Sequence, residues 1–112
     1  MDKKTRIIRT WRGWTNLENA PIYEDMLINE VFPEVKKKGV DGLEKVSIST
    51  MIKKDEVEFF LVLQFESLDS VIEFAGVDYE SAYIPDNARK VLLRYDEKTL
   101  HYEFKKELIL KK

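Results

Sequence analysis

The feature that most constrains the fold is the segment VEFFLVLQF at residues 57–65, which is apolar on both sides of an extended chain except at Glu58 and Gln64. Side chains alternate between the two faces of a strand, so both faces of this strand need a cover. The turn residues KKDE join it to residues 42–52, GLEKVSISTMI, where only one side is apolar. The pattern predicts a hairpin in which residues 57–65 form a central strand and residues 42–52 a half-buried neighbour.

Residues 19–39 have the signals of a helix, with Asn19 as N-cap, Pro21 in the first turn and Gly39 just beyond the end. Pro33 lies inside this segment and cannot donate a backbone hydrogen bond, which predicts a kink or a loosened turn. The apolar residues expected on one face of this helix follow the i, i+3, i+4, i+7 spacing: Ile28, Val31, Phe32 and Val35.

The remaining segments complete the order of elements. Residues 5–13 and 99–104 are predicted as the first and last strands, with Gly13 ending the first. Residues 67–76 predict a short second helix that begins at a serine N-cap and stops at Gly76. Residues 84–96 predict a third helix from the helical spacing of their apolar residues, which are Ala88, Val91, Leu92 and Tyr95.

This order, strand–helix–strand–strand–helix–strand with one additional helix, predicts a ferredoxin-like α+β fold, a single antiparallel sheet with helices on one face. Residues 1–105 are expected to form one domain, and residues 106–112 a C-terminal tail whose short apolar run fits either a strand or a helix. Leu61 and Phe60 lie on opposite sides of the central strand, so one layer of helices leaves an apolar face uncovered. A second copy packed sheet to sheet covers it, which predicts a two-fold symmetric homodimer.

Composition limits the class of protein further. The 112 residues suit one globular domain, and the 19 basic and 21 acidic side chains are interspersed, so we expect no nucleic-acid partner. No apolar run approaches the ~20 residues of a membrane span, and residues 1–10 lack the apolar core of a signal peptide; both patterns predict a soluble, cytoplasmic protein. The chain has no cysteine and one histidine, so we expect no metal site.

Three stretches resemble the antibiotic biosynthesis monooxygenase superfamily: WRGWT at residues 11–15, EFAGVDYESAYIPDNAR at 73–89 and YDEKTLHYEF at 95–104. The resemblance implies a dimeric α+β barrel. Relatives in this superfamily include quinone-forming oxygenases without metal or flavin and haem-degrading enzymes, and both typically end the third strand with tryptophan, where this chain has Phe65. The haem degraders also supply an axial histidine from the second helix, and residues 67–76 contain none. The resemblance therefore implies a cofactor-independent monooxygenase acting on a phenolic or polycyclic aromatic substrate.

Several aromatic residues are candidates for a substrate-binding site. Trp11 and Trp14 are suited either to one wall of a pocket for a planar ligand or to packing at the rim of a dimer. Phe65 retains an aromatic wall without the indole N–H. Tyr79 and Tyr83, in the loop after the second helix, fit either a lid over the cavity or hydrophobic anchors of that loop.

Arg9 and His101 are the candidate catalytic residues. Arg9 shares a face with Trp11, where its guanidinium suits either a ligand carboxylate or enolate or an ion pair with a glutamate. His101 shares a face with Glu103; if Leu100 and its apolar neighbours face the helices, the imidazole faces the barrel interior or the dimer interface. It is either a general base or a structural histidine bonded to Glu103 or a partner carbonyl.

Two hypotheses about function follow from these candidates. One is a small oxygenase without cofactor, with Trp11 as wall, Arg9 as anion clamp and His101 as base. The other is a homodimer of the same fold that binds a small aromatic ligand or is purely structural. A closed cavity of several hundred cubic ångströms reached by His101 favours the first, whereas a barrel filled by Phe59, Phe60, Phe65 and Met51 favours the second.

Overall fold

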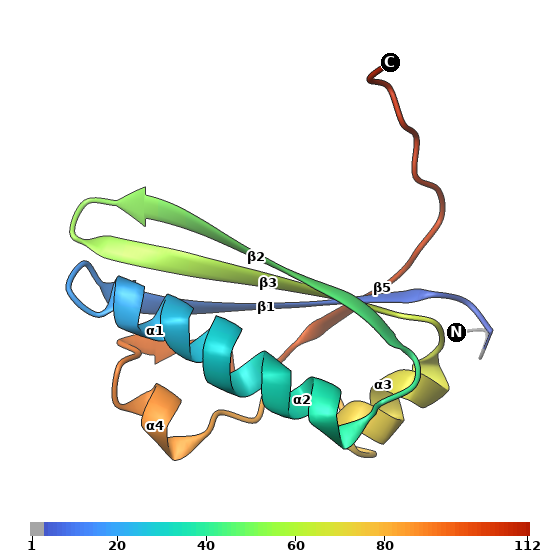
Figure 1. Cartoon of the computed structure of the whole chain (residues 1–112), viewed down its shortest axis with the longest axis horizontal. Coiled ribbons are helices and arrows are strands. Elements are labelled where there is room, and N and C mark those ends of the chain that lie inside the picture. The colour runs from blue at the N-terminus through green and yellow to red at the C-terminus, as the bar shows by residue number, and fades with distance from the viewer. Residues whose placement is uncertain (1–3) are drawn as a thin grey trace.

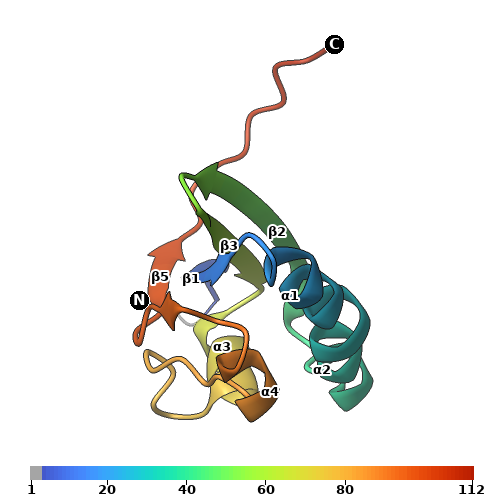
Figure 2. The same ribbon diagram turned by 90° about the vertical axis from the view of Figure 1, so that its left-hand side faces the viewer.

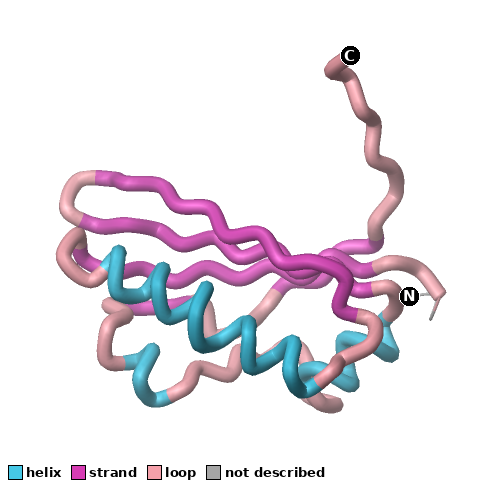
Figure 3. The backbone as a smooth tube through the Cα atoms, viewed as in Figure 1, coloured by secondary structure: helices cyan, strands magenta, loops and turns pink. Residues whose placement is uncertain are grey.

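The computed structural model describes residues 4–112 and is an antiparallel sheet with helices on one face (Figure 1, Figure 3). The sheet order is β2-β3-β1, with β4 and β5 both paired to β1 along its other edge. This arrangement confirms the predicted ferredoxin-like α+β fold. The elements are β1 (Ile7–Asn16), α1 (Ala20–Met26), the π-helical η1 (Leu27–Val31), α2 (Phe32–Lys38), β2 (Leu43–Lys53), β3 (Glu56–Phe65), α3 (Leu68–Ala75), α4 (Asp86–Arg89), β4 (Arg94–Tyr95) and β5 (Leu100–Glu103).

The core lies between the helices and one face of the sheet. Along β3, every second residue from Val57 to Phe65 is buried against the helices. The alternate residues of β3 point to the opposite face, which no helix within residues 4–112 covers, and Phe60 there is 38% exposed. The prediction that one apolar face of the central strand stays uncovered is therefore confirmed. The buried apolar side chains of the core are Ile7, Trp11, Tyr23, Met26, Leu27, Val57, Phe59, Leu61, Leu63, Phe65, Val71, Ile84 and Ala88.

The first helix is loosened at its proline, as predicted. The π-helical segment η1 ends at Val31, and α2 continues directly from it with Pro33 in its first turn, so the missing N–H of Pro33 cannot donate to the preceding turn. A π turn places residues five apart on one face, so Leu27 and Phe32 both face the core. The expectation that Ile28 faces the core is wrong, because the buried stripe begins one residue earlier, and Ile28 is half exposed. Asn19 is the N-cap residue, although its side chain makes no capping hydrogen bond.

Two predicted element boundaries differ from the structure. The first strand continues through Gly13 to Asn16, and the predicted helix over residues 84–96 is helical only at Asp86–Arg89. Residues 93–96 of that segment instead pair with the free edge of β1. The Leu93 N–H donates to the Trp14 carbonyl at 2.7 Å, and the Asp96 N–H donates to the Arg12 carbonyl at 2.9 Å. Sheet hydrogen bonds of this kind override a weak local preference for helix.

Within residues 4–112, no helix combines the length and the apolar character needed to cross a membrane.

Candidate functional site

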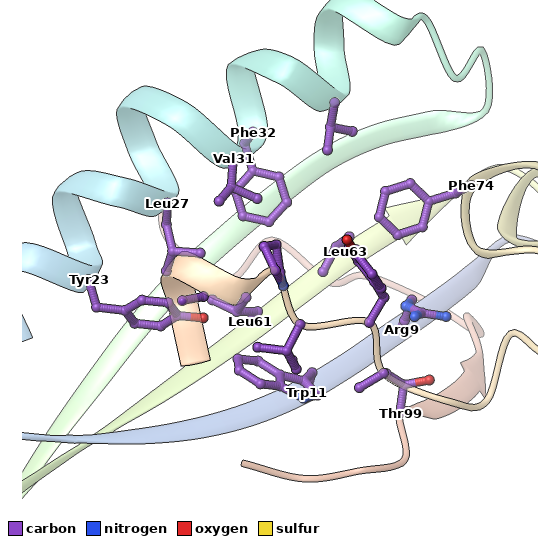
Figure 4. A pocket seen from close by; sticks show the side chains of 16 residues that line it. Arg9, Trp11, Tyr23, Leu27, Val31, Phe32, Leu61, Leu63, Phe74 and Thr99 are labelled. Atoms are coloured by element: carbon purple, nitrogen blue, oxygen red, sulfur yellow. The ribbon is translucent and has the colours of Figure 1, made fainter. Parts of the chain in front are cut away.

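A cavity lies between the helix-facing side of the sheet and the helices (Figure 4). Its volume is about 120 Å³, roughly ten times the ~10–15 Å³ that holds one water by the same measure. The lining is mostly apolar, with Leu61 and Leu63 of β3 on one side and the helical segment from Tyr23 to Val35 on the other. Such a cavity has the character of a small-molecule site, which needs few polar groups provided that they are well placed.

Arg9 supplies the charge in this cavity. It lies on β1 facing the helices and is only 6% exposed, and its guanidinium lies 5.6 Å from the ring centroid of Phe74. Its Nη1 donates to the Tyr79 carbonyl at 2.6 Å and contacts His101 Nε2 at 3.1 Å. Burial lowers the pKa of Arg9 to about 10, so the group remains a cation at neutral pH.

The predicted alternative of an Arg9–glutamate ion pair is wrong, because no carboxylate among residues 4–112 lies within ion-pair distance of Arg9. The hydrogen bonds to its guanidinium involve Nη1 only, which leaves Nε and Nη2 for another acceptor. A buried cation without a counter-charge is destabilising unless an anion or several acceptors compensate it.

Trp11 forms one wall of the cavity, in agreement with one of the two roles expected from the sequence. It is buried, and its indole Nε1 donates to the carbonyl oxygen of Asp96 at 2.8 Å. Because this bond uses the only polar group of the indole, the ring presents only its apolar surface to the cavity. Its orientation is also restricted, which suits a wall against which a planar ligand packs.

The two tryptophans do not share a pocket, which corrects the expectation that Trp11 and Trp14 form one wall. They are three residues apart on a continuous strand, so their side chains lie on opposite faces of the sheet. Trp14 instead lies near two arginines, whose guanidinium carbons are 5.1 Å (Arg12) and 4.5 Å (Arg94) from its ring centroid. Its role is surface packing by cation–π contacts.

The other aromatic candidates lie around the cavity in different ways. Phe65 is fully buried and does not line the cavity, but its ring packs 5.4 Å from that of Phe74, which does. Tyr79 contacts Arg9 through its backbone carbonyl and packs its ring edge-on against His101, with centroids 5.0 Å apart. Tyr83 lines the cavity edge and is 84% exposed. Only Tyr83 is therefore placed like a lid.

Among the aromatic and polar side chains that line the cavity, four were not identified as site candidates from the sequence: Tyr23, Phe32, Phe74 and Thr99. Burial raises the pKa of the Tyr23 phenol, so it stays neutral. Thr99 Oγ1 donates at 3.0 Å to the Tyr79 carbonyl, the same oxygen that accepts the hydrogen bond from Arg9, and so helps to hold this carbonyl in place. The only sequence signal for Tyr23 and Phe74 was their place on the apolar faces of two helices, a signal that core residues share.

His101 lies on the opposite side of the sheet from the one expected. In the β1–β5 pairing it is directly across from Arg9, facing the helices, whereas Leu100 and Tyr102 face the open side. It does not line the cavity, and Arg9 lies between it and the ligand space. The predicted bond to Glu103 is absent, since the Glu103 carboxylate instead accepts from Lys105 at 3.1 Å.

The imidazole of His101 is neutral and already engaged. Burial, and then the charge of Arg9, lower the pKa of His101 to about 4. Since Arg9 can only donate, His101 Nε2 accepts this bond and the ring proton lies on Nδ1. A base needs a free lone pair and a pKa near the working pH. The geometry therefore favours His101 as a hydrogen-bond acceptor that orients Arg9 and does not support His101 as a general base.

The state of His101 makes a prediction for stability against pH. As pH falls below ~6.5, the unfolded chain takes up a proton on His101 while the folded chain, with a pKa of about 4, does not. We expect the free energy of unfolding to decrease by about 1–2 kcal/mol between pH 6.5 and 4, discounted because the imidazole is partly exposed. Above pH 6.5 this contribution is constant.

Since His101 is the sole histidine, its ring protons give a single, unambiguous titration in the NMR spectrum. The His101→Gln variant is the control for stability, because it removes this titration and retains the carboxylates. Subtracting its pH profile from that of the wild type isolates the histidine contribution. A midpoint near pH 6.5 in the NMR titration contradicts the contact with Arg9.

Residues 4–112 contain no group of three or more histidine, cysteine or acidic side chains placed to hold a metal ion. The fold and the cavity together define a ferredoxin-like α+β protein with an arginine-containing pocket between sheet and helices.

Proteins of known structure share this fold, although their sequences differ widely from this one. Neither a scan of family models nor a search of curated proteins gives a match. Among solved structures, a Bacillus cereus protein provisionally assigned as an antibiotic biosynthesis monooxygenase is similar over 94% of this chain and 98% of its own, with a TM-score of 0.63 and 13% identity. A Shewanella oneidensis protein is similar over 88% of this chain and 92% of its own, with a TM-score of 0.57 and 13% identity. At such identity these matches show a shared fold.

Proposed function

We propose that this protein binds a small aromatic anion, a carboxylate, phenolate or enolate, in the cavity between sheet and helices. The observation that carries the proposal is Arg9, a buried cation with two unused donor nitrogens and no carboxylate partner among the described residues. The apolar walls, including the ring of Trp11, suit the hydrocarbon part of such a ligand. Hydrogen bonds between a guanidinium and an oxyanion are among the strongest that a protein makes.

The size of the cavity favours a ligand with one ring. A volume of about 120 Å³ holds on the order of ten waters, enough for a substituted benzene ring. A polycyclic compound needs more space, which an outward movement of the loop carrying Tyr83 provides. That side chain lies at the cavity edge and is almost fully exposed, so little packing opposes such a movement.

Cofactor-independent oxygenation is a second candidate function, which rests on the cation in the cavity and on the fold shared with the Bacillus cereus protein. A phenol or enol beside Arg9 ionises more readily, so the ligand enters as its anion and the chain needs no base of its own. The anion then reduces O₂. One oxygen atom replaces the two hydrogens of a substrate CH₂ to form C=O, the other leaves with those hydrogens as H₂O, and the substrate supplies all four electrons. The protein supplies charge stabilisation and exclusion of water.

A homodimer is the assembly that we propose for this chain. The open face of the sheet carries exposed apolar side chains from three strands, including Met51, Phe60, Leu100 and Tyr102. Exposed apolar groups on one sheet face favour association with a complementary surface. The same face on a second copy is such a surface under two-fold symmetry.

Ligand binding is tested by the fluorescence of Trp11 in a Trp14→Phe background, where it is the remaining tryptophan. We expect 4-nitrophenol to quench this emission and its visible absorbance to show a pKa lowered by about one unit on binding. The uncharged analogue 4-nitroanisole is the matched control and is expected to bind at least tenfold more weakly. Equal affinity for the two compounds contradicts an anion site.

Oxygenation is tested separately with an oxygen electrode in the presence of a chelator, using as substrate cyclohexane-1,3-dione, a single-ring enol whose CH₂ lies between two carbonyl groups. Oxygen uptake above that of the Arg9→Met variant supports turnover. Binding of 4-nitrophenol without such uptake leaves a binding protein and refutes the oxygenase.

A further inference from the structure

The cavity between sheet and helices has a free polar group at each of two opposite ends. It lies on the helical side of β1 and β3, where α1 and α4 face these strands (Figure 2). At one end is Arg9, whose Nε and Nη2 make no hydrogen bond within residues 4–112. At the other is Tyr23 of α1, which lines the cavity and is only 3% exposed. In Figure 4 the Tyr23 hydroxyl points away from its helix, toward Leu61 and the interior of the cavity.

The Tyr23 hydroxyl has no hydrogen-bond partner among residues 4–112. Within the same part of the chain, every fully buried side-chain nitrogen or oxygen does have a partner. The hydroxyl is therefore not sealed in the core, and the space next to it is the cavity that its residue lines. Since a tyrosine hydroxyl in a protein interior usually finds a partner, this one is available to a bound molecule.

The other polar groups around the cavity are already engaged or lie outside it. Trp11 Nε1 donates to the Asp96 carbonyl, and Thr99 Oγ1 donates to the Tyr79 carbonyl. Tyr83 is at the edge and is mostly exposed. The remaining side chains of the lining are apolar. Two groups, the guanidinium at one end and the phenol at the other, are therefore left to orient a ligand.

The register of the sheet gives the separation of these two groups. Arg9 of β1 is paired with Leu63 of β3. Four residues further along β1, Gly13 is paired with Phe59, on which Tyr23 packs with ring centroids 4.9 Å apart. Four strand positions correspond to roughly 13 Å. The guanidinium and the phenol hydroxyl take up part of this length, and the remainder suits one aromatic ring with a substituent at each end.

We propose that the ligand of this cavity is a single-ring aromatic acid with its carboxylate bound to Arg9 and an oxygen substituent, on the opposite ring carbon, hydrogen-bonded to Tyr23. This inference rests on the proposed anion site and narrows its ligand from small aromatic anions in general to para-substituted ones. Trp11 and Leu61, paired across β1 and β3 midway between the two ends, contact the ring.

Tyr23 is thereby the residue that determines specificity at the far end of the ligand. Burial raises the pKa of its phenol, so Tyr23 keeps its proton and donates it in a hydrogen bond to the distal oxygen. A ligand without that oxygen leaves the phenol unpaired, and an unpaired polar group in an apolar cavity weakens binding.

The test is a double comparison by isothermal titration calorimetry. The ligands are 4-hydroxybenzoate and 4-methylbenzoate, which differ by a hydroxyl and a methyl group of similar size, and the proteins are the wild type and Tyr23→Phe. We expect Tyr23→Phe to lower the affinity for 4-hydroxybenzoate about tenfold and not to lower that for 4-methylbenzoate. The variant keeps the ring that packs on Phe59 and removes a hydroxyl without a partner, so its melting temperature is expected to stay the same.

The possible results separate this inference from the anion site. If Tyr23→Phe changes the affinity for both ligands by the same factor, the specificity role of Tyr23 is overturned. In that case, a loss of affinity for both ligands in Arg9→Met leaves the anion site standing. If neither ligand binds to the wild type, the anion site and this inference are both overturned. A tenfold change in the ratio of the two affinities, seen with Tyr23→Phe and not with Arg9→Met, supports the inference.

Discussion

Replacement of Arg9 by methionine is expected to lower the affinity for an aromatic anion by about a hundredfold while leaving the fold as stable as before or more stable. Charge-assisted hydrogen bonds contribute roughly 1.5–3 kcal/mol, which corresponds to a factor of about 10–150 in binding. Stability is expected to rise by about 0–2 kcal/mol, because the variant removes a buried cation that no carboxylate of the described chain compensates. The Tyr79 carbonyl keeps its hydrogen bond from Thr99.

The two opposite effects distinguish a binding residue from a structural one. Fluorescence titration of Trp11 measures affinity, and urea denaturation measures the free energy of unfolding. Arg6→Met is the matched control. Arg6 is an exposed arginine immediately before β1 and is paired with Glu44 at 2.6 Å, so little change in either quantity is expected. Arg9→Met with unchanged affinity refutes the anion site. A loss of several kcal/mol in stability instead shows that Arg9 holds the fold together.

Two adjacent phenylalanines on β3 are expected to respond very differently to alanine. Phe59 is 1% exposed and packs edge-on against Tyr23 with ring centroids 4.9 Å apart, so Phe59→Ala is expected to destabilise the fold by about 3–5 kcal/mol. Phe60 lies on the open face, and Phe60→Ala is expected to change the stability of the monomer by less than about 1 kcal/mol. Its effect is expected on dimerisation, because its ring lies in the proposed interface.

The pair is an internal control, because the same chemical change is made at neighbouring positions of one strand. Urea denaturation at low protein concentration gives the stability of the monomer, and sedimentation equilibrium gives the dissociation constant. Equal destabilisation of the monomer by both variants contradicts the assignment of the two faces. Unaltered dimerisation in Phe60→Ala contradicts the open face as the interface.

Local sequence patterns predicted some features of the candidate site correctly and others wrongly. Strand alternation correctly placed Arg9 beside Trp11, because parity along a strand is a local property. Because the strand continues past Gly13, the same alternation places Trp14 on the opposite face of the sheet from Arg9 and Trp11. The expectation of a shared tryptophan wall was wrong because the predicted strand ended at Gly13. For His101 the relative faces were also correct, with Leu100 on the other side, but the side that meets the helices was reversed.

The contacts that define the site join residues distant in the chain. Arg9 and His101 are 92 positions apart, and Arg9 and Tyr79 are 70 apart. Neither contact leaves a periodic pattern in the sequence, so the neutral, proton-accepting state of His101 was not predictable. The expected glutamate partner of Arg9 failed for the same reason, since no local rule specifies which side chains fold against a buried guanidinium.

The sequence by itself determined the order of strands and helices, the antiparallel class of the sheet and the presence of an uncovered apolar face. Each of these follows from hydrophobic periodicity and from turn residues, which act over a few positions. Only the tertiary structure decided three features: which face of the sheet the helices cover, the pairing of residues 93–96 with the edge of β1, and the cavity that Arg9 lines. These depend on pairing and burial between distant segments, where the free energy of the whole packed core outweighs local preference.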